Sequence, residues 1–157
     1  MNDGRRTMLK GAGGAALLGL AMVAGLFRTG AAWAQGWNKA AFEVKTLNDA
    51  VKAMGGAPPT VSKDIIITSP DIAENGAVVP FTISSKIPNT EAIAVLVEKN
   101  PSILAARFDI PQGTDPWVNT RVKMGQTSNV FAVVKTSDGK FYYAPKEVKV
   151  TLGGCGG

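Results

Sequence analysis

The residue with the clearest chemical potential is Cys155, the only cysteine among 157 residues, which stands between two pairs of glycines at the C-terminus. A cysteine thiolate is a nucleophile that can form a reversible covalent bond to another sulfur atom. Glycine-rich ends are often no more than disordered termini, and a lone cysteine is often a small buried hydrophobe. Here the neighbouring glycines offer no side chains that could bury the thiol. We therefore expect Cys155 to be an exposed attachment point on a thin arm made of Gly153, Gly154, Gly156 and Gly157.

The rest of the composition argues against catalysis by this chain. It contains no histidine, which excludes Ser–His and Cys–His pairs, and one cysteine alone cannot build a zinc or iron–sulfur site. No phosphate-binding loop or dinucleotide fingerprint is present. Asp109 and Asp115 are close in sequence, but we expect them to serve turns rather than acid–base chemistry. The prediction is a substrate carrier with no metal and no cofactor, and with nothing nearby to activate its thiol.

The arm follows directly from an alternating segment in which Val148, Val150 and Leu152 share one face of a predicted strand. A strand of this kind would give the arm a rigid base. Arg121 and Lys123 lie opposite the apolar positions of an earlier strand. That pattern fits either a solvated strand face or a docking surface for anions or a partner.

An amphipathic helix is predicted over residues 40–54, where Leu47, Val51 and Met54 recur at helical spacing before Gly55 and Gly56 end it. A proline-containing linker follows at residues 57–59.

From residue 65 onward the sequence predicts short β-strands separated by turn residues, with a hairpin turn at residues 137–140. Residues 130–134 are apolar throughout, as in a central strand. The alternating apolar sets are Val79, Phe81 and Ile83; Ile93, Val95 and Val97; Leu104, Ala106, Phe108 and Ile110; and Val118, Thr120, Val122 and Met124. About seven such strands predict a mainly β fold, an immunoglobulin-like antiparallel β-sandwich with a short N-terminal helix and a flexible C-terminal arm.

The N-terminus has the layout of an export signal. Arg5 and Arg6 precede an apolar Gly/Ala-rich run, and a small-residue site predicts cleavage after Ala34. The paired arginines resemble the twin-arginine (Tat) type, which implies the periplasm. The apolar run is short and interrupted by glycines, which argues against a retained membrane anchor. The predicted organisation is a signal peptide at 1–34, a helix and linker at 35–59, a β-sandwich carrier domain at 60–152 and the arm at 153–157.

The charge balance gives no support to nucleic-acid binding. The chain has a formal net charge of +5, but residues 1–34 carry four basic residues and one acidic residue. The processed chain is therefore nearly balanced, and we expect it to bind neither nucleic acid nor membrane. Because the Tat route exports folded proteins, a co-exported partner is expected.

Taken together, these segments resemble the SoxY family. The resemblance is carried by the terminal Gly-Gly-Cys-Gly-Gly arm, the twin-arginine signal, and residues 73–80, 100–101, 120–124 and 148–151. It implies an immunoglobulin-like domain that forms a heterodimer with SoxZ. It also implies that Cys155 carries the sulfur intermediates of thiosulfate oxidation, loaded by the haem protein SoxAX. SoxB would then release sulfate, and SoxCD would oxidise the remaining sulfur where it is present.

Two other interpretations remain open at this point. A C-terminal Gly-Gly also marks ubiquitin-like sulfur carriers, which use a terminal thiocarboxylate made with ATP. Export to a compartment without ATP and the cysteine before Gly156 argue against this interpretation. Alternatively, Cys155 of a structural protein could link two copies, or two heterodimers, through a disulfide.

Overall fold

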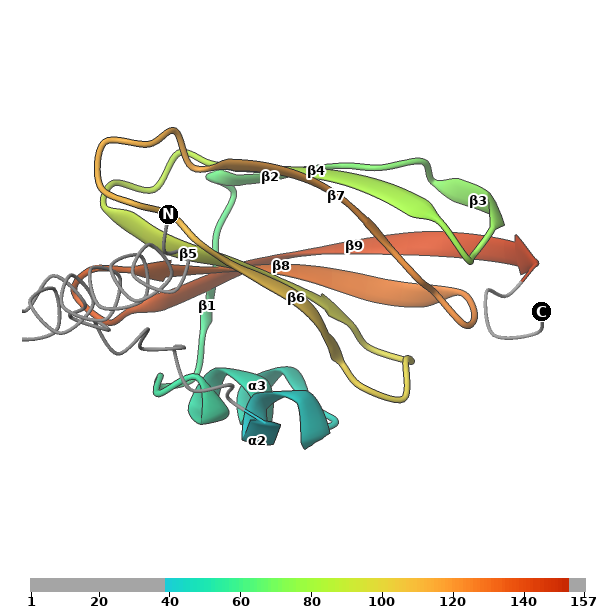
Figure 1. The fold of residues 1–157 in the computed structure, drawn as a ribbon, viewed down its shortest axis with the longest axis horizontal. Coiled ribbons are helices and arrows are strands. Elements are labelled where there is room, and N and C mark those ends of the chain that lie inside the picture. Colours follow the sequence, from blue (N-terminus) through green and yellow to red (C-terminus); the bar gives the residue numbers. More distant parts are fainter. Residues whose placement is uncertain (1–38, 153–157) are drawn as a thin grey trace, which may run out of the picture. The chain divides into compact units, whose positions relative to one another are not determined.

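The computed structural model describes residues 39–152, which form two short helices followed by nine β-strands (Figure 1). The helices are α2 (Lys39–Glu43) and α3 (Leu47–Ala53). The strands are β1 (Thr60–Val61), β2 (Ile65–Thr68), β3 (Ile72–Asn75), β4 (Val79–Ser85), β5 (Thr90–Val97), β6 (Leu104–Asp109), β7 (Trp117–Val122), β8 (Ser128–Thr136) and β9 (Phe141–Leu152).

The strands are arranged as a two-sheet sandwich of the predicted kind. The larger sheet has the order β1-β9-β8-β5-β6, with β3 also paired to β9, and the smaller sheet has the order β2-β4-β7. Most pairs are antiparallel, but β1 and β3 both pair parallel with β9, β1 near its start and β3 at its end. In Figure 1 the smaller sheet lies above the larger one, with α2 and α3 below.

The main core fills the space between the two sheets. Strand β4 alternates as predicted, with Val79, Phe81 and Ile83 fully buried. Val118, Val122 and Met124 meet them from β7 and the residues after it. Full burial of side chains of this size is worth about 1.5–3 kcal/mol each, so this layer contributes substantially to the stability of the fold.

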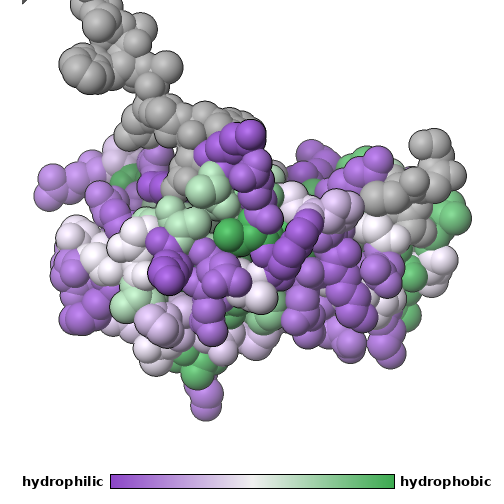
Figure 2. Space-filling model, turned by 90° about the horizontal axis from the view of Figure 1, so that it is seen from below, coloured by the Kyte–Doolittle hydropathy of each residue, from purple (hydrophilic) through white to green (hydrophobic). Residues whose placement is uncertain are grey.

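A second core lies between the larger sheet and the helices. Ala50 and Val51 of α3 pack with Ala94 and Leu96 of β5 and Val133 of β8. These two central strands are therefore buried on both faces, which explains why residues 130–134 are apolar throughout. From the helix side, the molecule is mostly hydrophilic on the outside (Figure 2).

The single helix predicted over residues 40–54 is wrong in one respect, because the chain forms two helices with a break between them. Thr46 has an extended backbone (φ −121°, ψ 154°), and its side chain accepts a hydrogen bond from the amide of Asp49. It is thus the N-cap of α3 and ends any continuous helix. The predicted face is retained, since Val51 is fully buried and Leu47 and Met54 pack partly against the same cluster.

Strand β6 also departs from simple alternation. Leu104 is opposite Leu96, and Ala106 is opposite Val95, so Ala105 is an extra residue in a β-bulge. Leu104 consequently belongs to the second core, between the larger sheet and the helices, whereas Phe108 packs against the main core between the two sheets. The prediction that these two residues share one face is wrong for this reason.

No helix within residues 39–152 is long and apolar enough to cross a membrane.

Candidate functional site

The structure describes the last residues of β9 (149–152), from which the arm continues and which we call the root of the arm, but it does not describe the arm itself. Cys155 and Gly153, Gly154, Gly156 and Gly157 lie outside the described residues, as do Arg5, Arg6 and the cleavage position after Ala34. The last described residue is Leu152, at the end of β9. Two residues separate it from Cys155, so along the chain the Cα atom of Cys155 is at most roughly 10 Å from the Cα atom of Leu152.

The end of β9 is held by β3, which runs parallel to it. Ile72 is opposite Lys149, and Asn75 is opposite Leu152, so the pairing continues to the last residue of the strand. The Thr151 hydroxyl also donates a hydrogen bond to the carbonyl oxygen of Glu74 (3.1 Å). The root is therefore a paired strand up to the point where the glycines begin.

A buried glycine in the β3–β4 turn fixes the final residue of the root. The amide of Gly76 donates to the carbonyl oxygen of Leu152 (2.8 Å), and its own carbonyl oxygen accepts from the amide of Met124 (2.7 Å). Leu152 is thereby connected through one residue, Gly76, to the chain that follows β7. Both polar backbone groups of a buried residue are satisfied by this arrangement.

Two polar side chains brace the same end of the sandwich. The Thr127 hydroxyl accepts a hydrogen bond from the amide of Val150 (2.9 Å). The Asn100 side chain donates to the carbonyl oxygen of Lys123 (2.6 Å) and accepts from the amide of Gly125 (3.1 Å). The segment between β7 and β8 is therefore held on both sides. These contacts also fix the position of Met124, whose amide donates to Gly76.

The sequence did not identify these bracing residues as functional. Gly76 and Asn100 lie in segments that carry the family resemblance but had no role assigned to them, and Thr127 carried no signal. Their role comes from hydrogen bonds to segments more than 20 residues away in sequence.

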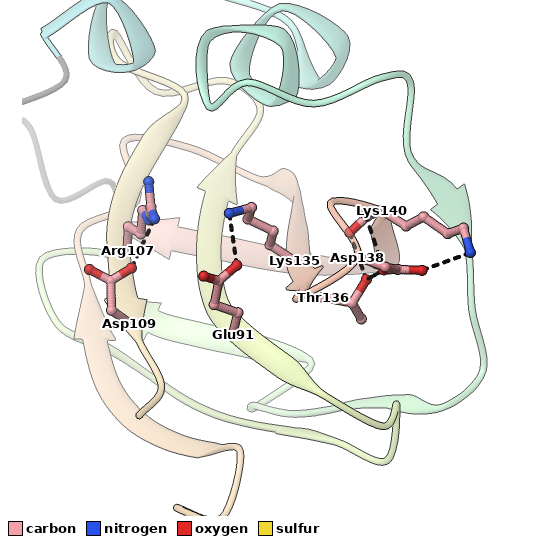
Figure 3. A network of polar contacts seen from close by, with 7 residues as sticks. All are labelled: Glu91, Arg107, Asp109, Lys135, Thr136, Asp138 and Lys140. Atoms are coloured by element: carbon pink, nitrogen blue, oxygen red, sulfur yellow. Dashed lines mark hydrogen bonds and ion pairs between the residues drawn. The ribbon is translucent and has the colours of Figure 1, made fainter. Parts of the chain in front are cut away.

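Arg121 and Lys123 are exposed on the outer side of the smaller sheet, as their alternation predicts. Within residues 39–152 neither has an ion-pair partner. By contrast, Arg107 binds Asp109 (2.9 Å) and Lys135 binds Glu91 (2.8 Å), both on the helix side of the larger sheet (Figure 3).

Asp109 and Asp115 are not brought together as an acid–base pair. Asp109 is bound to Arg107, and Asp115 accepts a backbone hydrogen bond from the amide of Trp117. Asp115 therefore has the turn role expected of it, whereas Asp109 is the last residue of β6 and pairs with an arginine of the same strand.

The predicted hairpin turn contains the one strongly perturbed acid among the described residues. The Asp138 carboxylate binds the ammonium of Lys140 (2.7 Å) and accepts from the hydroxyl of Thr136 (2.5 Å), as Figure 3 shows. These contacts, that with Lys140 foremost, lower the pKa of Asp138 to about 2 and raise the pKa of Lys140. The cluster stabilises the turn that precedes β9, whereas the arm follows the other end of that strand.

Across residues 39–152, no three acidic, cysteine or histidine side chains are grouped so as to hold a metal ion. A hollow beside Arg107, Lys135 and Phe141 has a volume of about 10 Å³, enough for about one water molecule. The feature of interest is thus the rigid root and the thiol that follows it.

Comparison with known proteins gives a family match over more than half of the chain. The family model described as "Sulfur oxidation protein SoxY" matches residues 50–155, which include Cys155. Among solved structures, the sulfur carrier protein SoxY from Chlorobium limicola f thiosulfatophilum is 41% identical, with a TM-score of 0.61. The match covers 68% of this chain and 96% of that one.

Other solved structures are more distant. A superoxide reductase (neelaredoxin) from Ignicoccus hospitalis is 20% identical, with a TM-score of 0.49 over 55% of this chain and 79% of that one. Such a likeness says nothing about function. No curated protein matches the sequence significantly.

Proposed function

Because the chain belongs to the SoxY family of sulfur carrier proteins, we propose that Cys155 carries sulfur intermediates of periplasmic thiosulfate oxidation as covalent adducts. The observation that carries the proposal is that the family match extends to Cys155, three residues beyond a strand that is paired to its last residue. A rigid root and a short glycine arm suit a thiol that must enter the active sites of other proteins.

The proposed cycle begins with the joining of two sulfur atoms. The Cys155 thiol loses its proton to solvent and its sulfur forms a bond to the outer sulfur of thiosulfate. The two sulfur atoms together lose two electrons, which the haem protein SoxAX would accept. The product is a cysteine S-thiosulfonate. The chain itself supplies the thiol and no oxidant, in keeping with a carrier that is not an enzyme.

The second step releases sulfate. Water attacks the terminal sulfonate sulfur, the bond between the two outer sulfur atoms breaks, and the electron pair stays on the sulfur attached to Cys155. Sulfate and protons leave, and a cysteine persulfide remains. SoxB would catalyse this hydrolysis, and SoxCD, where present, would oxidise the persulfide sulfur further.

Three further elements of the proposal concern assembly and location. The protein would be exported by the Tat pathway through Arg5 and Arg6, cleaved after Ala34 and active in the periplasm. It would act as a heterodimer with SoxZ, bind no nucleic acid and remain off the membrane after processing. Support comes from the signal-like sequence and from the family match.

The most direct biochemical test replaces Cys155 by serine (Cys155→Ser) and measures turnover in a reconstituted thiosulfate-oxidising system. We expect turnover to fall to background, because serine cannot form a bond to sulfane sulfur. The melting temperature should be unchanged, since the substitution lies outside the sandwich. Turnover above a few per cent of wild type would contradict the proposal, and Cys155→Ala provides a matched control for hydroxyl-specific effects.

A further inference from the structure

An asparagine followed by a glycine occurs once in this chain, at Asn75 and Gly76, where β3 ends. Such a pair can lose ammonia spontaneously, because the backbone nitrogen of the glycine can attack the side-chain carbonyl carbon of the asparagine. A Cβ atom on the second residue would hinder this attack, and glycine has none. Asn75 lies opposite Leu152 in the strand register, so this reactive pair is beside the root of the arm.

The folded root holds both reacting groups in hydrogen bonds. The amide of Gly76 donates to the carbonyl oxygen of Leu152 (2.8 Å), and Gly76 is buried. The side-chain oxygen of Asn75 accepts from the amide of Ala77 (2.8 Å). The attack requires the Gly76 nitrogen to lose its proton and to approach the Asn75 side chain, so the bond to Leu152 must break first. The closed root, with this bond in place, therefore suppresses deamidation.

The root is also a place where the sheet can open locally. β3 is four residues long, and its last residue pairs with the last residue of β9 (Figure 1). The ends of paired strands open at a lower free energy than central strands do. The exposed Thr151 holds the two strands together one residue before the end, where its hydroxyl donates to the carbonyl oxygen of Glu74 (3.1 Å). Loss of this bond would raise the fraction of molecules with an open root.

We propose that Asn75 is a deamidation site whose rate is set by opening of the arm root and whose isoaspartate product keeps the root open. In the open root, base removes the proton of the Gly76 amide, and the nitrogen forms a bond to the side-chain carbonyl carbon of Asn75. The bond from that carbon to the side-chain nitrogen breaks, and this nitrogen leaves as ammonia with a proton from water. Water then hydrolyses the cyclic imide at either carbonyl, which gives aspartate or isoaspartate. No electrons are gained or lost, so no oxidant or reductant is needed.

The isoaspartate product does not fit the closed root. Its main chain runs through the former side chain, so one extra methylene group stands between position 75 and Gly76. In the closed root, the amide of Gly76 bonds to Leu152, and its carbonyl oxygen accepts from the amide of Met124 (2.7 Å). A longer backbone cannot make both bonds while β3 keeps its register with β9. The product would therefore release Leu152 and shift the base of the arm, whatever Cys155 carries.

The first measurement compares deamidation in the folded and the unfolded protein. The processed, arm-bearing chain is incubated in warm, mildly alkaline buffer with and without guanidinium chloride. Mass spectrometry of the peptide that contains Asn75 then follows the replacement of its side-chain amide by a carboxyl group. We expect the reaction to be at least about ten-fold slower in the folded protein, because only the open fraction reacts. Equal rates in the two conditions, or an intact Asn75 in both, would overturn the inference.

The second measurement loosens the root itself. Thr151→Val removes the hydroxyl that bonds to Glu74 and keeps a β-branched side chain suited to a strand. We expect deamidation of the folded variant to be about three- to ten-fold faster than in wild type, and unchanged in guanidinium chloride. The matched control is Thr60→Val, an exposed position of β1 opposite Tyr142, near the other end of β9, and it should leave the rate unchanged. Equal rates in folded Thr151→Val and wild type would show that root opening does not control the site.

The third measurement examines the product. The isoaspartate form is separated from the unmodified protein by ion exchange, and amide hydrogen exchange is compared between the two. The amide of Met124 should exchange at least about ten-fold faster in the isoaspartate form, because its acceptor on Gly76 is displaced. The amide of Ser62, which donates to Tyr143 near the start of β9 (2.9 Å), should exchange equally in both forms. Equal protection of Met124 in both forms would overturn the claim that the product keeps the root open.

Discussion

Cys155 is proposed to work with no activating residue of its own. The chain has no histidine, so no imidazole can take the proton from the thiol. A free cysteine is mostly protonated at neutral pH, and only its thiolate attacks sulfur efficiently. Activation would then come from the enzyme that the arm enters. A carrier of this kind stays unreactive between its partners.

The charged group with the clearest local role is Asp138. Its contacts with Lys140 and Thr136 favour the ionised form in the folded protein and lower its pKa to about 2. Because the folded pKa is depressed, the contribution to the turn is present above the unfolded value of about 3.9 and is lost as pH falls through about 2.

A carboxyl-carbon NMR titration of the folded protein tests this assignment. The Asp138 midpoint should fall near pH 2, and in Lys140→Ala it should move up toward the ordinary aspartate value because the largest cause of the shift is removed. A wild-type midpoint near the model value of 3.8 would show that the contacts seen in the turn do not persist in solution.

At the scale of elements, most strands could be predicted because their alternation matches the sheet that buries them. The break in the predicted helix had a local signal, since Thr46 and Asp49 have the spacing of an N-cap and its acidic partner. The bulge at Ala105 had none, because it depends on the register with β5. The pairing of β3 with β9 at the root of the arm could not be predicted either, because the two strands are far apart in sequence.

The junction between α3 and β9 gives a prediction about stability. A Cβ atom added at Gly56 would lie 2.4 Å from two ring carbons of Phe141 and 2.9 Å from Val51. Phe141 and Val51 are buried in the second core, between the larger sheet and the helices, so neither side chain can move aside freely. Gly56→Ala should therefore destabilise the protein by about 1–3 kcal/mol, as other overpacked cores do.

Urea denaturation of Gly56→Ala provides the measurement. The neighbouring exposed change Ala57→Ser is the control and should alter the free energy of unfolding by less than about 0.5 kcal/mol. Equal stability of Gly56→Ala and wild type would mean that the α3–β9 contact is looser than the structure shows.

At the scale of the molecule, the sandwich provides the cores of the domain and a fixed starting point for the arm. The larger sheet packs on the helices with one face and on the smaller sheet with the other, which gives the domain its cores. One end of the sandwich holds Leu152 and so sets where the arm starts. The thiol could be identified from sequence because it is unique, whereas the pairing that holds the root of the arm required the strand register.

The central claim is that Cys155 carries sulfur, and mass spectrometry of the C-terminal peptide from cells given thiosulfate tests it most directly. The account predicts a fraction of the peptide heavier by the mass of S2O3, located on Cys155 and removed by a thiol reductant. An adduct-free thiol, a disulfide between two Cys155 residues as the sole modified form, or a thiocarboxylate on Gly157 would contradict it.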